Sequence, residues 1–257
     1  MSKYKIVEDG LVAKWDCDDW TSGTEWTDSI NSKKITFSSL PSSKSEDGIE
    51  LTSSITFVSE SLGLGLSYPC TFEFVGRIDG NWSSSSPANV FGLSNSKGSW
   101  SGICCYSKTS SNGIQLDIGS SGTVKSGVYT SGIEYHIIVT VNSSKTTTLY
   151  VNSITSKGTT SNSQGYQAKN YLYNSEGSGR FYGAIQRMAL WNKCLSASEI
   201  ETLFEEETTG SGLFLKQGTS WKEAQSIYKK VSGSWVQITS SDLKEELDAG
   251  INLVNGE

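Results

Sequence analysis

The sequence predicts an all-β chain: a two-sheet antiparallel sandwich with one short helix, followed by a small C-terminal appendage of β-hairpin and helix. Short apolar segments recur at regular spacing between clusters of Ser, Gly and Asn, which is typical of strands joined by polar turns. The 8 Trp, 11 Tyr and 8 Phe among 257 residues supply apolar surface for a packed core. The composition changes after residue 207, so we expect an arm at 1–9, a sandwich at 10–207 and a linker with appendage at 208–257.

Eight of the expected strands lie in the first half of the sandwich. They span residues 11–15, 34–37, 48–51, 55–58, 71–78, 90–93, 102–106 and 114–118. The 71–78 segment alternates most clearly, with Phe72, Phe74 and Ile78 on one face and Glu73 on the other. The polar segment 39–47 is turn-like, and Gly80–Ser86 is expected to be a loop.

Residues 135–151 predict a hairpin. Tyr135, Ile137, Val139 and Val141 share one face, and a turn at 142–145 leads to a returning strand that ends at Val151. Farther on, the aromatic-rich segment containing Tyr166, Tyr171 and Tyr173 is expected to be a loop whose rings pack against the protein.

A strand at 181–191 precedes the one helix expected in the sandwich. Ser196 and Glu199 have the spacing of a capping box, in which each side chain accepts a free backbone N–H. Leu195 and Ile200 can pack together across the helix start, and Leu203 extends the apolar stripe. We expect this helical turn to close one end of the sandwich.

The appendage begins with a flexible link at 208–212. Two Gly-Ser-Trp-like units, ending at Trp221 and Trp235, flank the apolar run 227–231 and predict a repeat of strand, turn and Trp. Residues 241–249 predict an amphipathic helix that Gly250 ends. So short a segment cannot bury a core alone, and we expect it to pack on the sandwich or on another subunit.

Charge and composition exclude several classes of partner. The net charge of −6 argues against nucleic acid, since phosphate binding needs a cationic surface. No segment has the apolar length needed to cross a bilayer. The first six residues lack the apolar core of a secretory signal, and the five cysteines are odd in number without metal-site spacing. We therefore expect reduced cysteines in a protein that is made and assembled in a cytosol.

Three blocks of sequence carry a family resemblance. They comprise Gly10–Asp16 with Trp26–Ser29, then Tyr135–Val141 with Thr148–Asn152, and finally Arg180–Phe204. In this order they resemble the laminin-G-like members of the concanavalin A-like lectin/glucanase superfamily. The resemblance implies a jelly roll for the sandwich, although Ser153 replaces the family's usual glycine. A shorter match, Tyr228–Val231 followed by Gly233–Val236, resembles segments of bacteriophage tail and appendage proteins.

Catalysis is not expected. The chain contains one histidine, His136, which excludes a His-based metal cluster or a Ser–His–Asp relay and is expected to be a packed or hydrogen-bonded structural residue. Glycosidases of the resembled superfamily carry two carboxylates on one strand, in a Glu-x-Asp-x-x-Glu pattern, and this motif is absent here. Glu73 has no acidic partner two or four residues away, although carboxylates from separate strands stay an alternative.

Two Trp-containing segments have the composition of a carbohydrate site. Sugar recognition pairs an aromatic platform with polar groups that bond the hydroxyls. The expected ligand-binding residues are Asp79, Asn81, Trp82, Asn95 and Trp100. The alternative for each Trp is to fold back over a sheet edge.

Asp16 and Asp28 are the candidate metal ligands. The resemblance implies a Ca²⁺ ion in some relatives, held between loops by oxygen ligands. The alternative, a turn-capping role, fits both aspartates equally well. No other cofactor is expected.

Together these features predict a non-catalytic carbohydrate-binding and adhesion module displayed on a bacteriophage virion. Its partners would be a cell-surface glycan, other virion subunits and copies of itself in a homo-oligomer. The alternatives are a purely structural decoration protein, a glycoside hydrolase and a bacterial surface lectin. The virion is the expected location, with a bacterial surface or secreted location as the alternative.

Overall fold

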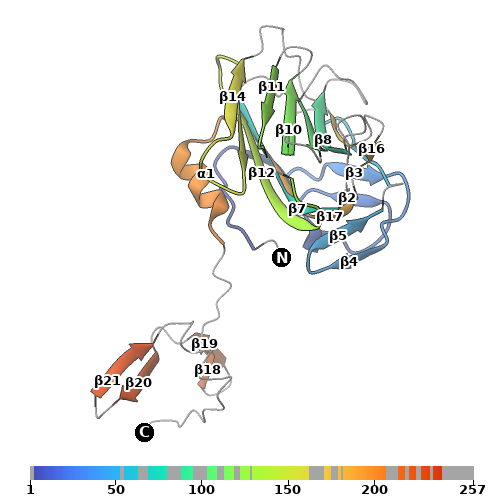
Figure 1. The fold of residues 1–257 in the computed structure, drawn as a ribbon. Helices are drawn as coiled ribbons and strands as arrows, with labels where there is room; N and C mark the ends of the chain where they lie inside the picture. The colour runs from blue at the N-terminus through green and yellow to red at the C-terminus, as the bar shows by residue number, and fades with distance from the viewer. Residues whose placement is uncertain are drawn as a thin grey trace. The chain divides into compact units, whose positions relative to one another are not determined.

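The computed structural model describes residues 3–52, 55–62, 69–79, 88–94, 103–108, 113–118, 122–127, 129–161, 171–174, 179–180, 182–206 and four strands between 214 and 238. The chain divides into two compact units, Met1–Glu206 and Glu207–Glu257. The first unit is a sandwich of two sheets with one short α-helix among its described residues (Figure 1). The predicted all-β sandwich with its jelly-roll architecture is confirmed.

The first sheet has eight strands, with β7 at its centre. In spatial order they are β14 (Gly158–Ser161), β13 (Thr146–Val151), β12 (Ile133–Val141), β7 (Cys70–Ile78), β17 (Gly183–Trp191), β5 (Gly48–Leu51) and β4 (Ser43–Ser45), with β1 (Leu11–Asp16) also paired to β17. All of these pairs are antiparallel. The predicted hairpin at 135–151 is therefore confirmed as β12 and β13, whereas β4 lies in the segment expected to be a turn.

The second sheet has nine strands. In order they are β11 (Gly122–Lys125), β10 (Gly113–Ile118), β9 (Ile103–Lys108), β8 (Ala88–Ser94), β15 (Tyr171–Tyr173), β6 (Phe57–Ser59), β3 (Lys34–Phe37) and β2 (Glu25–Thr27), with β16 (Gly179–Arg180) parallel to β8. The loop prediction for Tyr171 and Tyr173 is wrong, because both lie in β15. The packing prediction for Tyr173 holds, since its side chain is fully buried. Tyr166 lies outside the described residues.

The main core fills the space between the two sheets. Phe72, Phe74 and Ile78 project into it from β7, as their alternation predicts. Phe72 meets Phe91 of the facing sheet with ring centroids 4.3 Å apart. Each large apolar side chain buried in this way contributes about 1.5–3 kcal/mol to folding, so this layer holds the sheets together.

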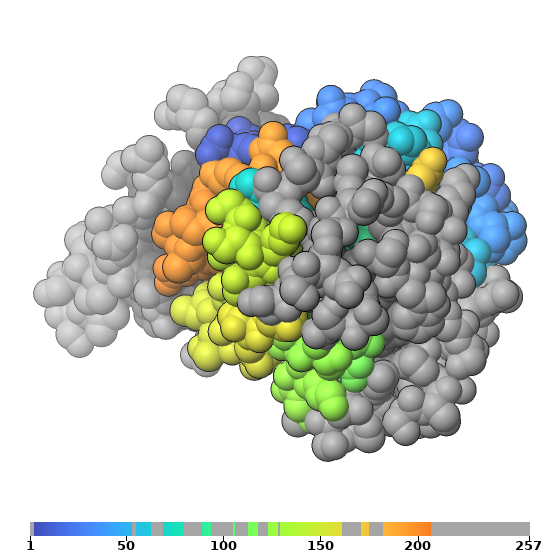
Figure 2. Space-filling model, turned by 90° about the horizontal axis from the view of Figure 1, so that it is seen from above, coloured from blue at the N-terminus to red at the C-terminus, as the bar shows by residue number. Residues whose placement is uncertain are grey.

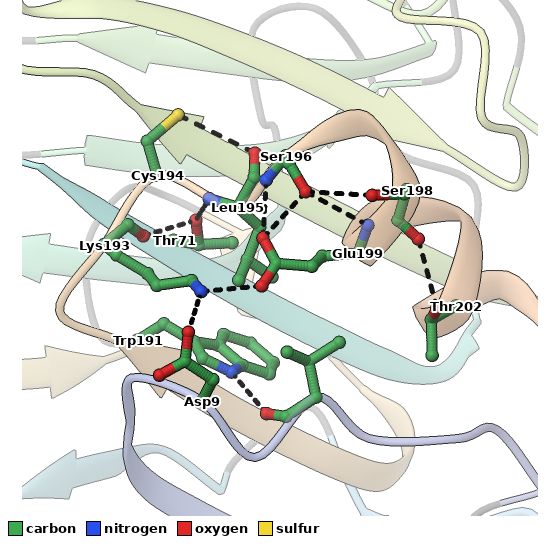
Figure 3. Close-up of polar contacts among 11 residues, drawn as sticks. Asp9, Thr71, Trp191, Lys193, Cys194, Leu195, Ser196, Ser198, Glu199 and Thr202 are labelled. Carbon is green, nitrogen blue, oxygen red and sulfur yellow. Dashed lines mark hydrogen bonds and ion pairs between the residues drawn. The ribbon is translucent and has the colours of Figure 1, made fainter.

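Helix α1 (Ala197–Phe204) begins with the predicted capping box. The Ser196 Oγ accepts the Glu199 N–H, and the Glu199 carboxylate accepts the Ser196 N–H at 2.8 Å (Figure 3). Lys193 donates to both Asp9 and Glu199. The Thr71 hydroxyl bonds the backbone on both sides of Cys194, which fixes the turn between β17 and α1.

The helix covers the outer face of the eight-stranded sheet. Leu195, Ile200 and Leu203 form a second apolar cluster with Ile138 of β12 and Trp191 of β17. In β12 the neighbouring residues Ile137 and Val139 belong to the main core, so Ile138 points away from it. The prediction that the helix closes an end of the sandwich is therefore wrong. Figure 2 shows α1 in orange beside the yellow-green strands of this sheet.

The N-terminal arm lies beside the helix on the same outer face. The Lys5 N–H donates to the Glu205 carbonyl at 2.9 Å, and the Trp191 indole N–H donates to the Val7 carbonyl at 2.7 Å. Ile6 and Val7 pack against the second apolar cluster. The arm is thus a part of the sandwich unit, and whether it also links to another subunit stays a prediction.

The second unit contains two hairpins. Strand β18 (Phe214–Gln217) pairs with β19 (Ser220–Glu223), and β20 (Ile227–Val231) pairs with β21 (Ser234–Ile238). Trp221 and Trp235 each occupy the second position of a returning strand, as the sequence repeat predicts. The helix predicted at 241–249 lies outside the described residues. Within the described parts of the chain, no helix has the length and apolar character required to cross a bilayer.

Candidate functional site

The outer face of the nine-stranded sheet carries a row of polar residues. Asn89 of β8 and Gln115 of β10 both pair in register with position 106 of β9, so the two side chains share a face. Asp117 follows Gln115 by two residues, while Ile114 and Leu116 point into the main core. The face opposite the core is therefore polar along β8 and β10.

Tyr173 lies on the same face through its pairing with Gly92. A Cβ added to Gly92 would come within 2.6 Å of the Tyr173 ring, so only glycine lets the ring cross β8 at this point. We call Asn89, Gln115, Asp117, Thr123 and Tyr173 the polar sheet face. It combines an aromatic ring with amide, carboxylate and hydroxyl groups.

The polar sheet face becomes more exposed toward its edge. Asn89 and Tyr173 are buried, Asp117 is half-buried, and Thr123 of the edge strand β11 is exposed. The Asp117 carboxylate accepts from the Gln115 amide at 2.6 Å and from the Thr123 hydroxyl at 2.9 Å. Among the described residues, neither polar atom of the Asn89 amide has a hydrogen-bond partner. A buried amide without partners costs about 1–3 kcal/mol, so such a group is suited to bind a ligand or water.

Of the five predicted ligand-binding residues, only Asp79 falls in the described part of the chain. Its carboxylate accepts from the Arg77 guanidinium, with Nε to Oδ1 at 3.1 Å, and Arg77 also pairs with Glu50 and Asp47. Asp79 therefore belongs to a surface ion-pair network on the first sheet. The other four, Asn81, Trp82, Asn95 and Trp100, lie outside the described residues. Their two segments join opposite ends of β8, the strand that carries Asn89.

The two predicted metal ligands both bond backbone N–H groups. Asp28 is buried and accepts from Lys14, Ile30, Asn31 and Lys33, at 2.8–3.3 Å. Asp16 accepts the Asp18 N–H at 3.1 Å and thereby caps the short 3₁₀ helix η1 (Cys17–Asp19).

The ligand atoms of Asp16, Cys17 and Asp18 lie within 4.8 Å of one another. Ca²⁺ prefers oxygen ligands, so a thiol in this group does not suit it. The carboxylate oxygens of Asp28 are meanwhile occupied by four backbone donors. The geometry thus assigns Asp28 to the turn that it organises.

A buried charged group that the sequence did not reveal lies on the outer face of the eight-stranded sheet. Both carboxylate oxygens of Glu73 bond the Arg187 guanidinium at 2.8 Å, and Oε1 also meets the His136 Nε2 at 2.8 Å. Burial alone would raise the pKa of Glu73, but Arg187 and His136 outweigh it and hold that pKa at about 2. The carboxylate is therefore ionised, and His136 is hydrogen-bonded as predicted.

The two stacked antiparallel sheets define a jelly-roll domain. The sequence pattern of the concanavalin A-like lectin/glucanases superfamily matches residues 67–201. The chain belongs to this superfamily.

Several solved structures share this fold with the chain at low sequence identity. The chain matches a Trypanosoma rangeli sialidase in complex with sialic acid with a TM-score of 0.61 and 15% identity, covering 77% of this chain and 33% of that one. It matches domain 4 of AbnA, an extracellular arabinanase of Geobacillus stearothermophilus in complex with arabinotriose, with a TM-score of 0.56 and 14% identity, covering 76% and 98%. It matches the receptor binding domain of botulinum neurotoxin D with a TM-score of 0.57 and 10% identity, covering 76% and 52%.

These similarities show the fold, and the chain spans only about a third of the length of the sialidase. No curated protein matches the sequence.

Proposed function

We propose that the chain is a non-catalytic carbohydrate-binding module that serves adhesion within a larger assembly. The polar sheet face carries this proposal. Asp117, Gln115 and Thr123 offer hydrogen-bonding groups for sugar hydroxyls at a sheet edge. The Tyr173 ring and the Asn89 amide, which has no partner among the described residues, lie deeper on the same face. The match covers 98% of the arabinanase domain, which was solved in complex with arabinotriose, and this supports the ligand class.

The state of Glu73 supports a role without catalysis. This strand carboxylate is fully buried and engaged with Arg187 and His136. A glycosidase acid must instead reach the scissile bond and hold a proton near neutral pH, which requires a raised pKa. The pKa of Glu73 is instead lowered, and its carboxylate is buried away from solvent.

For the larger assembly we propose a bacteriophage virion, with a cell-surface glycan and other virion subunits as partners. The support is the separate C-terminal unit of two hairpins and the likeness of residues 228–236 to phage tail segments. On this proposal the protein is assembled in the host cytoplasm and acts at the virion surface.

The second candidate is a purely structural virion protein, which the same C-terminal hairpins favour. Light scattering after size exclusion distinguishes the two candidates when it is combined with glycan binding. A stable oligomer that binds no glycan would favour the structural role.

A glycan array with the full chain tests the proposed function. Asp117→Asn removes an accepting carboxylate oxygen, and we expect the affinity for any bound glycan to fall about tenfold or more, since hydrogen bonds to charged groups contribute about 1.5–3 kcal/mol. The control is Asp19→Asn, an exposed carboxylate on a different part of the sandwich. Equal binding by the two variants would contradict the assignment of the polar sheet face, and silence across the array would contradict glycan binding.

A further inference from the structure

A pocket of about 580 Å³ lies on the outer face of the eight-stranded sheet, away from the polar sheet face. The N-terminal arm, β12, the turn after β13 and the end of α1 meet there. Its lining includes Tyr4, Glu134, His136, Ser153, Phe204 and Glu206. Pockets of about 300–1,000 Å³ accommodate small organic ligands, so this volume fits such a molecule.

Aromatic rings form one wall of the pocket. The His136 ring lies between Tyr4 and Phe204, with centroid separations of 4.4 Å and 4.5 Å. Asn152 holds this part of β12 in place, because its side-chain oxygen accepts the backbone N–H of His136 at 2.6 Å. Asn152 adopts a left-handed backbone with φ of 49°, which asparagine tolerates better than most residues. The wall is therefore positioned before any ligand arrives.

The His136 ring brings a second nitrogen, Nδ1, to this wall. The ionised Glu73 carboxylate can only accept, so the proton lies on the His136 Nε2 that faces it. The other ring nitrogen, Nδ1, is buried and has no hydrogen-bond partner among the described residues. A ligand that forms a hydrogen bond with Nδ1 would remove the cost of leaving a buried polar atom unpaired.

Two carboxylates of the pocket already hold an ammonium group that belongs to the chain itself. The Lys3 Nζ lies 3.1 Å from Glu134 Oε1 and 3.2 Å from Glu206 Oε1. It also lies 5.1 Å from the centre of the Tyr4 ring, within the range of a cation–π interaction. The Lys3 side chain is 45% exposed, and exposed ion pairs of this kind contribute little to stability. A ligand cation can therefore replace it.

We propose that this pocket binds a small organic cation that carries a primary ammonium or guanidinium group. The cation would lie between Glu134 and Glu206 with its apolar part against Tyr4 and Phe204, and Lys3 would be its displaceable internal competitor. The proposal is independent of glycan binding, because it concerns the other sheet and a different ligand chemistry.

Calorimetric titration of the full chain with matched small molecules tests the ligand class. Tyramine carries an ammonium on an aromatic body, and 4-ethylphenol has the same ring and side chain without the ammonium. We expect tyramine to bind at least tenfold more tightly. Ethylguanidine, which carries a guanidinium without an amine, and D-glucosamine, compared with D-glucose, distinguish a guanidinium or an amino sugar as the source of the cation. Equal affinity for each amine and its uncharged partner, or no binding of any amine at millimolar concentration, would overturn the proposal.

Variants locate the binding site. Glu206→Gln keeps the shape of an exposed side chain but removes its charge, and we expect tyramine affinity to fall about tenfold. Glu201→Gln is the control, an exposed glutamate of α1 that does not line the pocket. Lys3→Ala should tighten binding several-fold, which no loss of structure would produce. Equal affinities of the two glutamine variants would overturn the site, and unchanged or weaker binding by Lys3→Ala would overturn the role of Lys3.

Discussion

Arg187 and Glu73 form a buried bidentate ion pair between neighbouring strands of the eight-stranded sheet, with Nε–Oε2 and Nη2–Oε1 distances of 2.8 Å. The same guanidinium donates to the carbonyls of Tyr4 at 2.6 Å and Lys5 at 3.0 Å. One side chain thus joins the central strand of the sheet to the N-terminal arm. The arm in turn forms a side of the pocket at His136.

Replacing Arg187 by Met should lower the free energy of unfolding by about 3–5 kcal/mol, because it leaves the buried Glu73 charge without its main partner. Urea denaturation measures this change. Lys34→Met is the control, since Lys34 forms an exposed ion pair with Glu25 whose loss should cost far less than the loss of the buried pair. Similar costs for both variants would contradict the importance of the buried pair.

The Glu73 carboxyl predicts a loss of stability in acid. Its folded pKa of about 2 lies below its ordinary value of 4.5, so the unfolded chain binds more protons between these values. The stabilisation is complete above about pH 4.5 and declines by about 1.4 kcal/mol per pH unit as the pH falls toward 2.

Urea denaturation of the wild type and Glu73→Gln at pH 6, 4 and 3 checks this prediction. The difference in unfolding free energy between the two proteins should shrink as the pH falls, because the variant has no carboxyl to protonate. A difference that is the same at all three values would show that Glu73 is not the group responsible.

Removal of the helix cap should have a smaller effect. Ser196→Ala deletes the acceptor of the Glu199 N–H and should destabilise the protein by about 1 kcal/mol in chemical denaturation. The neighbouring exposed Ser198→Ala should change stability by less than about 0.5 kcal/mol. If Ser198→Ala proves as costly as Ser196→Ala, the capping interaction is not the source of the effect.

Asp28 should act as a turn organiser rather than as a calcium ligand. Asp28→Asn weakens its contacts with four backbone N–H groups and should lower the free energy of unfolding by about 2 kcal/mol. The same loss is expected in EDTA and in millimolar CaCl₂. A calcium-dependent rise of the melting temperature that occurs in the wild type but not in Asp28→Asn would contradict this role.

Local sequence signals predicted the local structure well. The capping box of Ser196 and Glu199 depends on residues three apart, and the faces of β7 and β12 depend on simple alternation. Such features are determined within one element, so a single sequence reveals them. The helix start, the central hairpin and the core positions of Phe72 and Phe74 were all predictable in this way.

The features that needed the structure arise from long-range register. Glu73 and His136 are 63 residues apart, and Glu73 and Arg187 are 114 apart, so only the pairing of three strands brings them together. The outward position of α1 depends on which sheet face accepts Ile200 and Leu203, which an amphipathic pattern does not specify. The polar sheet face likewise depends on the register that aligns Asn89 with Gln115.

The central claim is that the chain binds a glycan without cleaving it. Saturation-transfer difference NMR, with an oligosaccharide selected on the glycan array, tests both parts of this claim in one sample. We expect saturation transfer from the full chain to the sugar protons, and weaker transfer from Asp117→Asn. The anomeric signals should stay unchanged over long incubation. Absence of saturation transfer for every selected oligosaccharide, or new anomeric signals from cleavage, would contradict it.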